Sequence, residues 1–156
     1  MQSNFGARQD FTVLGVAIGA HILQDQLRGK ELGSVIAIVA TDAPLQPHQL
    51  KRLARRVPLG LARTGTVGNN SSGDIFLAFS TANEVALGST AKLRRADYLA
   101  NSAIDGLFRA VVEATEEAVL DAMICNETMV GRDGNIAIAL PVEQMLQLLR
   151  KQERLS

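Results

Sequence analysis

Gly33-Ser-Val-Ile-Ala-Ile-Val-Ala-Thr41 is the most hydrophobic stretch of this 156-residue chain, and it decides the predicted fold. A short, nearly continuous apolar run is typical of a β-strand that is covered on both faces. A helix is predicted to begin at Pro47, because proline fits the first turn of a helix, and Pro58 interrupts that helix. A second strand is predicted at Asp74–Ser80. The sequence therefore predicts a strand–helix–strand unit.

Further elements are predicted on both sides of this unit. Phe11–Ile18 is rich in β-forming residues and indicates an earlier strand with a bend at Gly15. His21–Lys30 is polar and mixed, and it indicates a linker. Residues 64–73 contain three glycines and several small polar residues, so they are expected to form a loop.

The C-terminal half predicts a long amphipathic helix, a turn, a strand and a final helix. The apolar stripe of the long helix consists of Ile104, Leu107, Phe108, Val111, Thr115, Ala118, Val119 and Ala122. Gly131–Gly134 indicates the turn, Ile136–Leu140 the strand, and Pro141 opens a helix that runs to about Arg154. This order of elements indicates helices packed on a sheet, in the α/β or α+β class.

Composition excludes several classes of protein. Hydrophobic residues make up 47% of the chain and charged residues 21%, so the chain can bury a core and is not intrinsically disordered. Lys and Arg together number 16, as do Asp and Glu, and the aromatic fraction is 4%, so nucleic-acid binding is not expected. No apolar run approaches the roughly 18 residues that span a bilayer. No membrane association is predicted, and no signal peptide is seen after Met1, which favours a cytoplasmic location unless an upstream segment carries a signal.

Several local signals have ordinary structural explanations. Lys51, Arg52, Arg55 and Arg56 share a helical face, which is expected to be solvated. The Gly-rich loop lacks the lysine of a nucleotide-binding P-loop. Cys125 follows an apolar helix and is expected to be a small buried side chain. With one cysteine and two distant histidines, no disulfide, metal site or cofactor is predicted.

Three polar positions stand where the edge of the sheet can present a side chain into a cleft. Ser34 opens the most hydrophobic strand, and Asn4 lies in the compact N-terminal stretch. Ser72-Gly73-Asp74 ends the Gly-rich loop at the entrance of the next strand. Gly33-Ser34 alone indicates only a turn. It is the combination of the three positions that indicates a candidate functional site.

The sequence resembles the DmpA-type aminopeptidases along essentially its whole length. These are also called L-aminopeptidase/D-Ala-esterase/amidases and include the β-peptidyl aminopeptidases. The motifs that carry the resemblance are Gln2-Ser-Asn-Phe-Gly6, the stretch Gly33–Arg56, Leu61-Ala-Arg-Thr-Gly65 and the stretch Ser72–Asn83.

The resemblance implies a fold, a nucleophile and a processing step. The fold would be part of an αββα sandwich of the DOM superfamily, similar to that of the N-terminal nucleophile hydrolases. The precursor would cut itself between Gly33 and Ser34. Residues 1–33 would then end the large subunit, residues 34–156 would form the small subunit, and Ser34 would become the N-terminal nucleophile.

The resemblance also implies roles for the other polar positions. Asn4 matches the asparagine that helps to form the oxyanion hole, and Ser72 and Asp74 match the pair that supports the nucleophile. Asp74 stands where some relatives have Glu. Family members form homo-oligomers and act on short peptides, aminoacyl amides or esters.

The residues are consistent with this chemistry but leave alternatives open. An α-amino group has a pKa near 7.7–8.0, so cleavage before Ser34 places a partly free base on the residue that carries the nucleophile. A typical member has a long segment before the position of Gln2, so this chain resembles only its C-terminal portion. The alternatives are a non-catalytic fragment that needs a separate N-terminal half, and a related acyltransferase, against which Ser34 argues because those enzymes use threonine.

Overall fold

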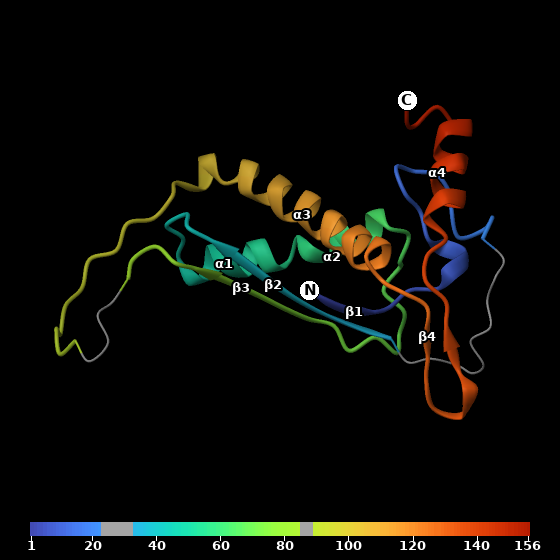
Figure 1. The fold of residues 1–156 in the computed structure, drawn as a ribbon. Helices are drawn as coiled ribbons and strands as arrows, with labels where there is room; N and C mark the ends of the chain where they lie inside the picture. The colour runs from blue at the N-terminus through green and yellow to red at the C-terminus, as the bar shows by residue number, and fades with distance from the viewer. Residues whose placement is uncertain (23–32, 85–88) are drawn as a thin grey trace.

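The computed structural model of the chain describes residues 1–22, 33–84 and 89–156. Its central strand is β2 (Ser34–Thr41), which pairs antiparallel with β1 (Gln2–Asn4) on one edge and parallel with β3 (Ile75–Ser80) on the other. Figure 1 shows these three strands side by side beneath the helices. Both strands of the predicted strand–helix–strand unit are confirmed.

Two short helices connect β2 to β3 in place of one kinked helix. α1 (Pro47–Ala54) begins at the expected proline, and α2 (Val57–Arg63) carries Pro58 in its first turn. The predicted interruption is therefore confirmed. It lies at Arg55 and Arg56 because Pro58 has no N–H to continue the hydrogen bonding of α1.

The helices cover one face of the sheet only (Figure 1). Val35 and Ala37 of β2 point into this side and are buried at 1% and 5% exposure. α3 (Asp105–Ile124) crosses above α2, and the predicted apolar stripe supplies its buried side chains. The two helices approach closely at Gly60, where a Cβ would lie 2.6 Å from the side chain of Thr115. The core consists of Val35, Ala37, Leu45, Leu53, Val57, Leu61, Ile104, Val111 and Val119.

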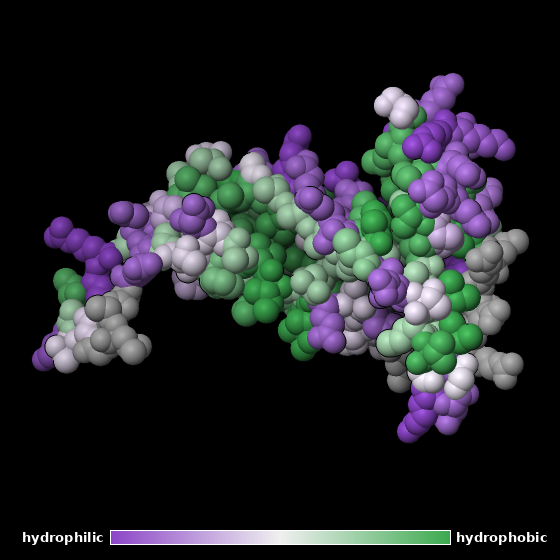
Figure 2. All heavy atoms as spheres, in the orientation of Figure 1, coloured by the Kyte–Doolittle hydropathy of each residue, from purple (hydrophilic) through white to green (hydrophobic). Residues whose placement is uncertain are grey.

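The opposite face of the sheet is apolar and bare. Side chains alternate across a strand, so the neighbours of Val35 and Ala37 point away from the helices. Ile38 and Ile75 are each 60% exposed, and Leu77 is 54% exposed. This open face consists of Ile36, Ile38, Ile75, Leu77 and Phe79. Figure 2 shows hydrophobic side chains gathered below α3, in the region of the sheet. A sheet covered on one face and bare on the other has the form of one half of an αββα sandwich.

The predicted strand at Phe11–Ile18 is wrong. A short 3₁₀ helix (Arg8–Asp10) precedes a tight turn in which Val13 and Val16 exchange two main-chain hydrogen bonds. Leu14 and Gly15 both have positive φ angles, 50° and 78°, so the chain reverses where a strand was expected. The predicted linker at His21–Lys30 lies almost entirely outside the described residues.

The C-terminal elements form a second, smaller core with this turn. β4 (Met129–Val130) and β5 (Ile136–Ala137) make a hairpin around a 3₁₀ turn at Arg132–Gly134, and α4 (Val142–Lys151) follows. The predicted strand and final helix are thus present, and both are shorter than expected. The buried residues of this second core are Val13, Ile18, Ile22, Met145 and Leu149.

The four basic residues predicted to share a solvated helical face are only half solvated. Lys51 and Arg55 are exposed as expected. Arg52 and Arg56 instead lie over the ring of Phe108, with guanidinium carbons 5.0 Å and 3.9 Å from its centroid. Arg52 also donates a hydrogen bond to Asn101 in the 3₁₀ turn Asn101–Ala103, just before α3. Arg52 therefore fastens α1 to α3, and Arg56 fastens the start of α2 to α3.

The open face predicts that the chain associates when it is produced alone. Exposed contiguous apolar surface drives association in water, so light scattering after size exclusion should show species larger than a monomer. The double change Ile38→Thr and Leu77→Thr should reduce this association. Val67→Thr, in a loop residue that is 81% exposed, is the control and should leave it unchanged. A monodisperse monomer of the unchanged chain would contradict the prediction.

Candidate active site

Ser34 stands at the first position of the central strand, between two other segments. β1 lies on one side of β2, and the segment that leads into β3 lies on the other. The Ser34 Oγ accepts a hydrogen bond of 3.1 Å from the main-chain N–H of Gly73. This donor lies in the stretch Ser72-Gly73-Asp74. Sequence analysis predicts roles for Ser72 and Asp74 but none for Gly73.

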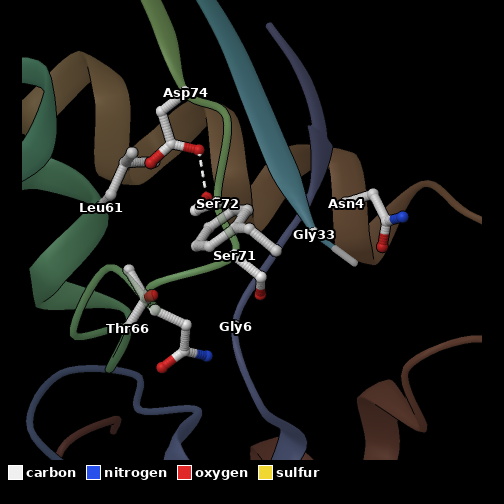
Figure 3. A pocket seen from close by; sticks show the side chains of 10 residues that line it. Asn4, Gly6, Gly33, Leu61, Thr66, Ser71, Ser72 and Asp74 are labelled. Atoms are coloured by element: carbon white, nitrogen blue, oxygen red, sulfur yellow. Dashed lines mark hydrogen bonds between the residues drawn. The ribbon is translucent and has the colours of Figure 1, made fainter. Parts of the chain in front are cut away.

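Asn4 lies directly across from Ser34 in the antiparallel register of β1 and β2. Residues that are directly opposite in such a pair project from the same face of the sheet. Ser34 alternates with Val35, so both side chains stand on the side of the open face. Figure 3 shows Asn4 on one side of the Gly33 end of β2, with its amide pointing away from Ser72 and Asp74 on the other.

Asp74 ties the start of β2 to the end of the Gly-rich loop. Its Oδ1 accepts hydrogen bonds from the main-chain N–H of Val35 at 3.0 Å and from the Ser72 hydroxyl at 2.5 Å. Hydrogen bonds to an ionised carboxylate are shorter and stronger than those between neutral groups. The predicted pair Ser72–Asp74 therefore forms in the structure, and it contacts the peptide unit that follows Ser34.

Glycine is required directly before Ser34, and a second glycine lies against the Ser34 side chain. A Cβ on Gly33 would lie 2.7 Å from the carbonyl oxygen of Asn4 and 3.0 Å from the Cα of Phe5, and neither atom belongs to a movable side chain. A Cβ on Gly73 would lie 3.3 Å from the Ser34 Oγ. The backbone before the serine is thus packed directly on the backbone of β1.

A small cavity of about 60 Å³ adjoins these residues. Asn4, Gly33, Ser72 and Asp74 line it and were expected at the site. The lining residues that sequence analysis did not single out are Phe5, Gly6, Leu61, Thr66, Asn69 and Ser71. Most of them belong to two motifs that had been recognised as units, the N-terminal stretch and the Gly-rich loop. Membership of these motifs is the sequence signal that could have identified them as residues of the site.

Cys125 does not belong to the site, and its predicted burial is wrong. The side chain is exposed just after the end of α3. Its Sγ–H donates a weak hydrogen bond of 3.5 Å to Asp121. This hydrogen bond, with the negative charge of the same carboxylate, raises the pKa of the Cys125 thiol. Raising the pKa lowers the fraction of reactive thiolate at neutral pH.

The described part of the chain has neither a membrane-spanning helix nor a cluster of metal-binding side chains. No helix in residues 1–22, 33–84 or 89–156 is long and apolar enough to cross a membrane. Within the same ranges, no three His, Cys, Asp or Glu side chains are grouped so that they could hold a metal ion.

Comparison with known proteins identifies the family. Peptidase family S58 matches residues 1–137. The chain belongs to this family. β-Peptidyl aminopeptidase BapA of Sphingosinicella microcystinivorans is 36% identical over 171 residues, an alignment that covers 100% of this chain and 43% of the relative. The resemblance to DmpA-type aminopeptidases is therefore confirmed.

Solved structures of similar proteins confirm the fold class. The L-aminopeptidase D-Ala-esterase/amidase of Ochrobactrum anthropi, described as a variant of the Ntn hydrolase fold, superposes with a TM-score of 0.89 at 40% identity. A β-aminopeptidase of a Burkholderia species gives a TM-score of 0.82 at 37% identity. These two structures match 98% and 95% of this S58 chain, whereas the chain spans 42% of each of them. It therefore spans about two fifths of the relatives that it matches.

The packing of Gly33 predicts that alanine is not tolerated there. We expect Gly33→Ala to lower the free energy of unfolding by about 1–3 kcal/mol, because the added Cβ must push β1 away from the start of β2. Gly106→Ala is the matched control, since a Cβ there meets no atom within 4 Å. It should be neutral, or stabilising by up to about 1 kcal/mol, as for other helical glycines. Urea denaturation measures both changes, and equal stabilities would contradict the prediction.

Proposed function

We propose that this chain is the C-terminal part of a self-processing serine aminopeptidase that removes N-terminal residues from short peptides, amides or esters. Ser34 would be the nucleophile. The observation that carries the proposal is the position of Ser34, flanked by Asn4 on one strand and by the Ser72–Asp74 pair on the other side. Membership of family S58 supports it.

Processing would create the base as well as the nucleophile. The Ser34 Oγ would attack the carbonyl carbon of Gly33, the peptide nitrogen would take up a proton and leave, and water would hydrolyse the resulting ester. Unperturbed α-amino groups have a pKa near 7.7–8.0 and are partly unprotonated at neutral pH, so the new amino group of Ser34 would be able to accept the proton of the hydroxyl. Residues 34–156 would then form the small subunit, and residues 1–33 would end the large one.

Asn4 and Asp74, on either side of Ser34, would stabilise the transition state and position the nucleophile. When Ser34 attacks a substrate carbonyl, negative charge develops on the carbonyl oxygen and needs a fixed donor. The amide of Asn4 would donate to this oxygen without placing an ion in the site. The Asp74 carboxylate would hold the start of β2 through Val35, and after processing it would lie near the amino group of Ser34 and orient Ser72.

The N-terminal part of the complete protein would be the first binding partner of this chain. The chain spans only 41–43% of its relatives, and Ser34 and Asn4 stand on the side of the open face. An N-terminal part packed on that face would enclose the site and complete the sandwich. We therefore propose that the chain alone neither cleaves itself nor hydrolyses aminoacyl amides, and that the complete protein forms a homo-oligomer.

Ser34→Ala tests the assignment of the nucleophile. A suitable protein is a full-length chimera in which this chain replaces the matching 42% of the Ochrobactrum anthropi relative. Intact-mass analysis should find a fragment of residues 34–156 in the chimera and none in Ser34→Ala, which has no hydroxyl to attack Gly33. Ser102→Ala, an exposed serine outside the site, should be processed normally. Cleavage of the Ser34→Ala chimera at the same bond would refute the proposal.

Asn4→Ala tests the oxyanion role. In the processed chimera, kcat should fall by about 10²–10³-fold, because the lost hydrogen bond forms mainly in the transition state. KM should change far less, for the same reason. Asn70→Ala, in the exposed part of the Gly-rich loop, serves as the control. Steady-state rates on an aminoacyl p-nitroanilide give both constants, and an unchanged kcat would remove Asn4 from the mechanism.

A further inference from the structure

The side chain of Ser34 has a contact that the proposed mechanism does not use. Its Oγ accepts a hydrogen bond of 3.1 Å from the main-chain N–H of Gly73. This distance lies in the usual range for an N–H···O hydrogen bond. A hydroxyl oxygen has two lone pairs, so one can accept this bond while the other stays free to attack a carbonyl carbon. The Gly73 N–H therefore contacts the atom that would react.

The structure does not need this hydrogen bond to hold the backbone together. Gly73 and Ser34 are both exposed, so water could satisfy the Gly73 N–H at little cost. The two segments are already joined by the hydrogen bond between the Val35 N–H and Asp74 at 3.0 Å. The parallel pairing of β2 and β3 joins them again from Ile36 onward. A purely structural role leaves the contact with the Ser34 Oγ unexplained.

The absence of a side chain at position 73 points to the same oxygen. Gly73 does not adopt the left-handed conformation that would by itself favour glycine. A Cβ at this position would lie 3.3 Å from the Ser34 Oγ, which is closer than most such contacts in proteins. Glycine therefore lets the main chain approach the hydroxyl and donate to it without pressing on it.

We propose that the main-chain N–H of Gly73 is a further catalytic group, which stabilises the negative charge on the Ser34 Oγ, above all when this oxygen leaves the acyl ester. The inference rests on the proposed function, because it takes Ser34 as the nucleophile. It is distinct from the role of Asn4, whose amide would act on the carbonyl oxygen of the bond that is cut.

The donor suits the step in which Ser34 is released. The oxygen of water bonds to the acyl carbon of the ester, and a proton of this water passes to the α-amino group of Ser34. The C–Oγ bond then breaks with its electron pair going to Oγ, and the proton passes from the amino group to Oγ. A fixed N–H beside Oγ stabilises it as a leaving group, because a preorganised dipole needs no rearrangement when charge develops.

The effect should be largest in the complete protein. Ser34 stands on the side of the open face, which the N-terminal part would cover on the proposed function. Hydrogen bonds are electrostatically stronger where water is excluded. The full-length chimera is therefore the protein in which to measure the contribution of Gly73.

Replacing Gly73 by glycolic acid in the chimera tests the donor directly, because it exchanges the N–H for an ester oxygen and adds no side chain. We expect kcat on an aminoacyl p-nitroanilide to fall by about 10-fold or more with KM within about 3-fold, as for a group needed in the transition state. The control is the same replacement at Gly131, whose N–H donates to the Asn135 carbonyl at 2.7 Å in the exposed hairpin. It should change neither constant.

Self-processing of the chimera should respond in the same way. The same oxygen attacks Gly33 and then leaves the Gly33 ester, so intact mass should show the fragment 34–156 forming more slowly after the replacement at Gly73. Turnover is compared once processing is complete. Loss of processing at Gly73 alone, with the elution volume on size exclusion unchanged, would support the proposal in the same way.

The build-up of acylated Ser34 separates a leaving-group role from a general loosening of the site. With an activated aminoacyl ester as substrate, attack is fast and release of Ser34 limits the rate. Mass spectrometry after rapid quenching should then find a larger acylated fraction in the Gly73 variant than in the unchanged chimera. The Gly131 variant should match the unchanged chimera. A loosened site would slow the attack as well and would leave less acylated protein.

Gly73→Ala is a second variant that keeps the N–H and adds the Cβ. We expect kcat to fall, because the Cβ displaces the Ser34 Oγ from its donor. Gly131→Ala is the matched control, since its Cβ would lie at an ordinary 3.6 Å from the Asn135 carbonyl oxygen. It should have the kcat of the unchanged chimera.

The outcomes separate this inference from the proposed function. An active chimera in which loss of the Gly73 N–H changes neither kcat nor the acylated fraction would overturn the inference alone. Equal losses at Gly131, or slower turnover without a larger acylated fraction, would also overturn it. A chimera with Gly73 intact that hydrolyses no aminoacyl amide would contradict the proposed function, and the catalytic role of Gly73 would fall with it.

Discussion

The hydrogen bond from the Val35 N–H to the Asp74 carboxylate is the contact on which the geometry of the site depends. It joins the first peptide unit after Ser34, in strand β2, to the end of the Gly-rich loop, and the two residues are 39 positions apart in the sequence. Because the same oxygen also accepts a hydrogen bond from the Ser72 hydroxyl, the carboxylate fixes the loop end and the strand start together. The parallel pairing of β2 and β3 then continues this alignment from Ile36 onward. Ser34 is therefore held by its neighbours in the strand rather than by contacts of its own side chain alone.

The position of Ser34 at the start of the strand has a chemical consequence. A residue inside a strand has its main-chain groups engaged in the ladder, whereas the N-terminal end of a strand can be cut without breaking pairs on its C-terminal side. Gly33 precedes β2 and packs closely on the Asn4–Phe5 backbone, which holds the bond before Ser34 next to β1. On the proposed function, the cut would release an amino group where Asp74 already binds the adjacent peptide N–H.

The sequence predicted those parts of the fold that depend on local patterns. The apolar run at Ser34–Thr41, the helix start at Pro47 and the interruption by Pro58 follow from strand hydrophobicity and from the missing N–H of proline, and all three are present. The strand predicted at Phe11–Ile18 is wrong because two residues with positive φ reverse the chain in a segment whose composition favours a strand. The predicted burial of Cys125 is wrong as well. A residue that follows an apolar helix is expected to be buried, but α3 ends at Ile124 and the Cys125 thiol is exposed.

The residues of the candidate site were predicted from the sequence, whereas their arrangement in space was not. Ser34, Asn4, Ser72 and Asp74 came from motifs, but their spacing in the sequence carries no register, and Thr66 and Asn69 reach the cavity only because the Gly-rich loop folds back. The apolar run Val35–Ala40 predicts a strand buried on both faces, whereas in the structure only one face is buried. That difference is informative, since Val-Ile-Ala-Ile-Val places bulky side chains on the bare side as well. A strand with apolar side chains on both faces, and with Ser34 and Asn4 on its bare side, fits a sheet that another part of the same fold would cover. On the proposed function, the surface that completes the core would also enclose the active site, so that folding and catalytic competence would be reached together.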